Sequence, residues 1–137
     1  MNRADLQRLS RLRIQESRGL FRTKMYSGAY YLAGYSIECA LKACIAKNTE
    51  KFEFPDKARV VKSYVHKPSE LIDVANLSGI FQQARQANPK LQASWNVVNN
   101  WSEQSRYTIW SRADADAMID AVGKLRDGVL PWIKLHW

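Results

Sequence analysis

The residues best suited to chemistry lie in one long apolar stretch, residues 28–47. Glu38 and Lys42 are four positions apart within it, so at about 100° per residue they fall on the same sector of a helix. Tyr31 and Tyr35 share that sector. A carboxylate and an ammonium in the centre of a helical bundle are costly unless they are paired. The sector therefore either meets other polar groups or opens onto a cleft.

A second polar group follows the tryptophans Trp95 and Trp101. It is the segment 102–107, in which Arg106 is placed to meet Glu38 of the central helix. One interpretation is a buried Glu38–Arg106 salt bridge that seals the bundle, and removing one partner of such a pair costs about 3–5 kcal/mol. The alternative is a pocket for the phosphate of a nucleotide or an RNA.

In the pocket interpretation, Arg106 and Lys42 contact the phosphate because a guanidinium and an ammonium both donate to its oxygens. A neighbouring tyrosine then stacks on a base or donates its hydroxyl. The predicted ligand-binding residues are Tyr31, Tyr35, Glu38, Lys42, Arg106 and Tyr107.

A stripe of four arginines runs along the first predicted helix, residues 3–24. Its members fall within an arc of about 80° and are Arg8, Arg11, Arg18 and Arg22. The leucines of the same helix share another side and are Leu6, Leu9, Leu12 and Leu20. The stripe is either a solvated face or an edge that contacts phosphates, since four guanidiniums in a line can follow a nucleic-acid backbone.

The composition is that of a folded, basic protein. The chain has 137 residues, of which 46% are hydrophobic, and its net charge of +8 favours polyanionic partners. We expect a single domain over residues 1–137. Cys39 and Cys44 point about 140° apart on one helix, so we interpret them as free buried thiols and expect neither a disulfide nor a metal site. With no signal peptide or membrane-spanning run, we expect a cytoplasmic protein without a cofactor or a membrane partner.

The rest of the chain predicts further helices and one long loop. We interpret residues 48–68 as the loop because they include Pro55 and Pro68 and have no clean period. Short helices follow over residues 68–74 and 80–87, and Pro89 opens a helix that brings the two tryptophans into the core.

The last predicted helix begins at Ser111, where Asp114 completes a capping box. Its expected buried stripe consists of Met118, Val122, Leu125, Val129 and either Trp132 or Ile133. No segment alternates like a strand. Together the elements predict an all-α, up-and-down antiparallel helical bundle with extra short helices.

Two blocks of the sequence resemble the HEPN domain family. Residues 28–43, GAYYLAGYSIECALKA, are similar to the second-helix signature of that family. Residues 95–107, WNVVNNWSEQSRY, are similar to a block of one HEPN branch. His66, with Leu71 and the turn at 75–79, sits where that branch has a His-Asp-Leu opening and an Ala-Gly end. The resemblance covers nearly the whole chain.

The resemblance implies a helical bundle that pairs as a homodimer. It also implies a role in toxin–antitoxin pairs, phage defence or RNA processing, often beside a nucleotidyltransferase-type partner protein. Catalytic HEPN domains resemble metal-independent ribonucleases, and their motif is an Arg and a His separated by four to six residues. The pair with that count here is Arg59 and His66, which lies in the early loop and not in the later helix where the family keeps its motif.

Three function classes remain open. The first is a noncatalytic HEPN module that binds RNA, a nucleotide or a partner protein. The second is a metal-independent endoribonuclease, in which Arg106 stabilises the phosphorane and Tyr107, Glu103 or His66 transfers protons. The third is a scaffold or antitoxin-like subunit.

Overall fold

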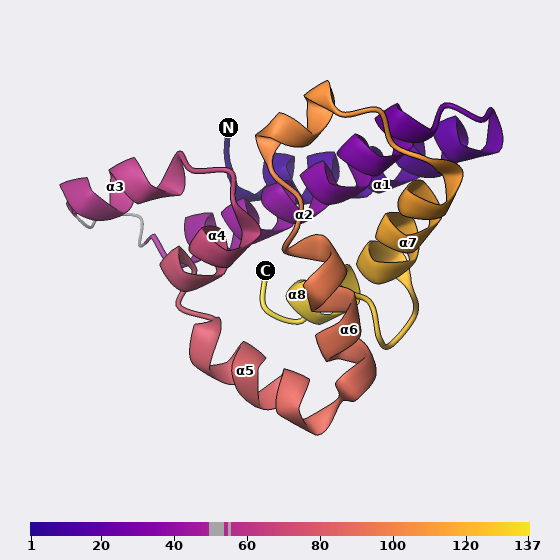
Figure 1. The fold of residues 1–137 in the computed structure, drawn as a ribbon. Coiled ribbons are helices and arrows are strands. Elements are labelled where there is room, and N and C mark those ends of the chain that lie inside the picture. Colours follow the sequence, from indigo (N-terminus) through magenta and orange to yellow (C-terminus); the bar gives the residue numbers. More distant parts are fainter. Residues whose placement is uncertain (50–53, 55) are drawn as a thin grey trace.

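The computed structural model describes residues 1–49, 54 and 56–137. All the regular secondary structure in these ranges is helical, and turns and loops connect the helices (Figure 1). The helices are α1 (Arg3–Arg22), α2 (Tyr26–Lys47), α3 (Lys57–Ser63), α4 (Pro68–Val74), α5 (Ser78–Ala87), α6 (Pro89–Val98), the 3-10 helix η1 (Glu103–Tyr107), α7 (Arg112–Gly123) and α8 (Val129–Lys134). The predicted all-α helical bundle is confirmed. Within the described ranges, no helix is both long and apolar enough to cross a membrane.

The centre of the bundle is α2, as the apolar run predicted. It lies in the middle of the bundle (Figure 1) and packs against α1, α4, α7, α8 and η1. Its side chains are buried almost all round. Small residues dominate its first half, and Ala29 and Ala33 are fully buried. Because these side chains are short, neighbouring helices can approach the backbone of α2 closely.

The closest neighbour of α2 is α1, which joins it through two hydroxyl groups. The Ser10 hydroxyl donates to the Ser36 carbonyl at 2.8 Å, and the Ser17 hydroxyl donates to the Ala29 carbonyl at 2.6 Å. Both serines are fully buried. The fully buried side of α1 thus carries these serines, whereas its leucines are only half-buried or, in the case of Leu12, 41% exposed.

The loop expected at 48–68 is only partly a loop. Residues 50–53 and 55 lie outside the described residues, but Lys57–Ser63 form helix α3. Asp56 begins this helix, because its carboxylate accepts a hydrogen bond from the Ala58 backbone N–H at 3.1 Å. In Figure 1, α3 lies at the margin of the molecule, and it packs against α4.

The last predicted helix is broken into α7 and α8. It begins as expected, with the Ser111–Asp114 capping box, but it ends at Gly123. Arg126 has a positive φ of 73°, and a Cβ on Gly128 would lie 2.6 Å from the Lys124 carbonyl oxygen. Leu125, expected in the buried stripe, lies in this turn and is 82% exposed.

Candidate functional site

The buried carboxylate of Glu38 is the centre of the candidate site. Glu38 is 3% exposed on α2. Its Oε1 accepts a hydrogen bond from Lys42 Nζ at 2.8 Å and lies 2.9 Å from His66 Nδ1. Its Oε2 is buried and has no hydrogen-bond partner among the described residues. Of the two alternatives for this sector of α2, polar partners or an open cleft, the Glu38 carboxylate shows polar partners.

His66 joins Glu38 to a second carboxylate. It follows α3 and precedes α4, and its Nε2 lies 3.0 Å from Oε2 of Glu103 on η1. Glu38, His66 and Glu103 therefore form one chain of contacts, which we call the carboxylate–histidine chain. Both ring nitrogens can donate at once only when the imidazole carries two protons.

The carboxylate–histidine chain ends at the surface. A cavity of about 280 Å³ lies there, and it is lined by Val65, His66, Lys67, Glu70, Ser102 and Glu103. The buried Glu38 carboxylate orients one nitrogen of His66 and Glu103 contacts the other, so a group in the cavity would exchange protons with the His66–Glu103 pair. The arrangement suits general acid–base chemistry.

Trp101 fixes η1, and with it Glu103, to α2. The Trp101 side chain is fully buried, and its Nε1 donates to the Tyr31 carbonyl at 3.1 Å. The rings of Tyr31 and Tyr35 lie 5.6 and 6.4 Å from the Trp101 ring. Both tyrosines are half-buried, and burial raises the pKa of Tyr35 above its usual value.

Arg106 does not pair with Glu38. It is exposed on η1, and its guanidinium lies 5.0 Å from the ring centre of Tyr107. The hydroxyl of Tyr107, and then that of Tyr31, raise the pKa of Arg106. Besides Lys42 on its own helix, Glu38 therefore contacts His66 and not the expected arginine. The segment between α3 and α4 reaches α2 and supplies this imidazole.

The arginine stripe of α1 is part of a larger basic face. Lys134 of α8 lies near the stripe, and burial, together with the charges of Arg11 and Arg18, lowers the Lys134 pKa. The Arg11 guanidinium lies 4.8 Å from the ring centre of Trp137, and Lys134 Nζ lies 5.7 Å from the same ring. Among the described residues, no member of this face forms an ion pair; the members are Arg8, Arg11, Arg18, Arg22 and Lys134.

Lys134 and Trp137 were not predicted as members of the basic face. They lie more than 100 positions from the arginines in the sequence, and only the packing of α8 against the bundle brings them together. The sequence composition could have indicated them, since residues 132–137 combine a lysine with aromatic residues.

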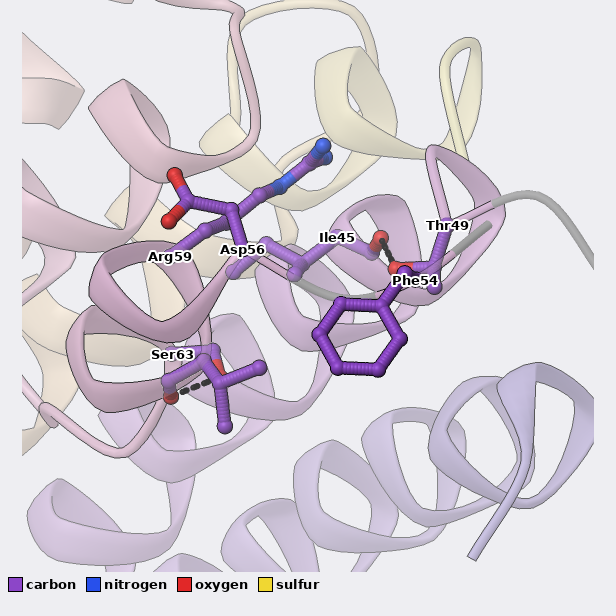
Figure 2. A pocket seen from close by; sticks show the side chains of 7 residues that line it. Ile45, Thr49, Phe54, Asp56, Arg59 and Ser63 are labelled. Carbon is purple, nitrogen blue, oxygen red and sulfur yellow. Dashed lines mark hydrogen bonds between the residues drawn. The ribbon is translucent and has the colours of Figure 1, made fainter. Parts of the chain in front are cut away.

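Arg59 lies apart from the carboxylate–histidine chain. Figure 2 shows it in a pocket between α3 and the end of α2, with Ile45 and Thr49 on the α2 side. The contacts of the His66 ring are with Glu38 and Glu103 instead. The hypothesis that Arg59 and His66 act together therefore gains no support from these contacts.

Comparison of the chain with protein-family models, with curated proteins and with solved structures finds no match. The HEPN assignment stays a prediction that depends on the two sequence blocks.

Proposed function

We propose that the protein binds single-stranded RNA through the basic face of α1 and α8. The observation that carries this proposal is that the Arg11 guanidinium and Lys134 Nζ both lie against the ring of Trp137, at 4.8 and 5.7 Å from its centre. Cations crowded in this way, with no acidic partner in the described part of the chain, suit a polyanion. The ring of Trp137 beside them offers a surface on which an unpaired base can stack.

The test is the salt dependence of RNA binding. Replacing Arg8 and Arg11 by Gln should weaken the binding of a single-stranded oligonucleotide and lower the salt slope by about 0.7 for each phosphate that the variant no longer neutralises. The matched control is the pair Lys62→Gln and Lys90→Gln, which removes the same charge from α3 and α6. If both double variants lower affinity equally, only the net charge matters and the face is an ordinary solvated surface.

A second candidate function is a metal-independent endoribonuclease. It is favoured by the carboxylate–histidine chain, in which His66 lies between a buried and a half-exposed carboxylate. Here His66 transfers protons, and Arg106, on the same short helix as Glu103, stabilises the negative charge on the phosphoryl oxygens. RNA incubated with the protein in excess EDTA should be cleaved, and His66→Gln should abolish cleavage while RNA binding persists. Uncleaved RNA would leave binding as the function.

The HEPN resemblance extends these proposals to the cellular setting. It supports a toxin–antitoxin or phage-defence role, a homodimer, and a nucleotidyltransferase-type partner protein. A nucleotide ligand, or a scaffold or antitoxin-like role, belongs to the same family setting. The neighbouring open reading frame and the mass of the protein in solution distinguish these possibilities.

A further inference from the structure

A cavity of about 330 Å³ lies between α3 and the last turn of α2. It is lined by the apolar residues Ile45, Phe54 and Val60 and the polar residues Thr49, Asp56, Arg59 and Ser63 (Figure 2). Two of the polar groups are already occupied. The Thr49 hydroxyl donates to the Ile45 carbonyl at 3.2 Å, and the Ser63 hydroxyl donates to the Val60 carbonyl at 2.6 Å. Both bonds are drawn as dashed lines in Figure 2.

Arg59 supplies the remaining donors. Its Nε and Nη2 are buried, and neither has a hydrogen-bond partner among the described residues. These two nitrogens share one edge of the guanidinium, so their N–H bonds are parallel and match the two oxygens of a carboxylate. Asp56 does not fill this role, because its carboxylate caps α3 and forms no ion pair with Arg59 in the described part of the chain.

The surface beyond the cavity is apolar and basic. Val60 lines the cavity, and Val61 on α3 and Tyr64 directly after it are further exposed apolar side chains. Phe54, on the other side, is 98% exposed. The exposed lysines of the same helix are Lys57 and Lys62. Exposed apolar surface therefore extends beyond the cavity itself. Lys62 lines a neighbouring cavity together with Asp73, so the positive charges of Arg59 and Lys57 are the ones that favour a negatively charged partner here.

We propose that α3 and the end of α2 bind an acidic peptide segment of a partner protein. One carboxylate of that segment pairs side-on with Nε and Nη2 of Arg59, and an apolar side chain next to it lies between Ile45 and Phe54. The site is separate from the basic face of α1 and α8 and does not depend on RNA binding.

The probe is a fluorescein-labelled peptide of the sequence Glu-Glu-Phe-Leu-Glu-Glu, compared by fluorescence anisotropy with its Gln-for-Glu counterpart. The acidic peptide should bind at least tenfold more tightly. Arg59→Lys keeps the charge but removes the paired edge, and it should lower the affinity about tenfold. Val61→Glu is a second variant on an exposed position, and it should repel the peptide. Lys90→Gln, on α6, is the control and should bind like the parent protein.

Circular dichroism shows whether each variant keeps the helical fold. If neither peptide binds, or if both bind equally, the proposal is wrong. Binding of AMP or of a 5′-phosphorylated oligonucleotide that disappears in Arg59→Lys, without peptide binding, would also overturn it, because the site would then recognise a phosphate.

Discussion

The indole ring of Trp101 occupies the space that a side chain on Gly34 would need. A Cβ on Gly34 would lie 2.1 Å from Trp101 Cδ1, far inside contact distance. The same ring donates its N–H to the Tyr31 carbonyl, three residues earlier on α2. Because Gly34 has no side chain, the Trp101 ring can pack directly against α2. This contact fixes the position of η1, which carries Glu103 and Arg106.

The first prediction is that Gly34→Ala destabilises the protein, although alanine is a better helix former than glycine. Overpacking against the fully buried indole should cost about 1–3 kcal/mol, measured as the free energy of unfolding in urea. The control is Gly79→Ala in α5, where nothing lies within 4 Å of the new Cβ and a gain of roughly 0.5–1 kcal/mol is expected. A Gly34→Ala protein as stable as the parent would contradict the packing described.

The second prediction is that Glu38 and His66 are energetically coupled. His66→Gln should destabilise the protein by about 1–3 kcal/mol, because the buried Glu38 oxygen loses a partner. In a double-mutant cycle with Glu38→Gln, the coupling energy should be about 0.5–3 kcal/mol. Glu103→Gln is the comparison, and it should cost at most about 1 kcal/mol because both side chains of that contact are partly exposed. A coupling energy near zero would mean that the His66 contact is incidental.

The third prediction concerns alkaline pH. Burial raises the pKa of both Cys39 and Cys44 from 9.0 to about 11. The fold thus favours the protonated thiols, so their contribution is fully present below about pH 9 and disappears as the pH rises to about 11. The free energy of unfolding should fall across this window, by on the order of 2 kcal/mol for each thiol.

The matched variant is Cys39→Ala with Cys44→Ala, whose stability should fall less over the same window. A thiol reagent at pH 7.5 should react slowly with the native protein and rapidly with the protein in guanidinium. Equal alkaline destabilisation of the parent and the double variant would assign the effect to other groups.

The fourth prediction is that the protein is a homodimer. Light scattering at micromolar concentration should give a mass of about twice 15.8 kDa. Leu12 in the middle of α1 and Met25 in the α1–α2 turn are exposed apolar side chains that a second copy can bury. Met25→Glu should shift the protein toward the monomer, and a monomer already at tens of micromolar would contradict this prediction.

The central helix could be predicted from the sequence because its pattern has one interpretation. An uninterrupted apolar run of this length fits a buried helix, and the structure has α2 over Tyr26–Lys47. The Ser111–Asp114 capping box was equally direct, since it depends on residues three apart. Both of these features depend on local spacing alone.

Features that depend on tertiary packing were not predicted correctly from the sequence. The leucines of α1 suggested one side of the helix, but two serines form its closest contact with α2, because hydroxyls can donate to carbonyls of a neighbouring helix. Likewise, Glu38 was expected to meet Arg106 but meets His66. His66 and Arg106 both lie far from Glu38 in the sequence. Their spacing from Glu38 does not indicate which of the two contacts it.

The close contact between α1 and α2 has a consequence for how the chain folds. The two helices are consecutive, are joined by a short turn and form the most extensive helix–helix contact in the described structure. Contacts between sequence neighbours require little loop-closure entropy, so this helical hairpin is the natural place for a folding nucleus. Substitutions at Ser10 or Ser17 should then slow folding, whereas substitutions in α3, at the margin, should mainly speed unfolding.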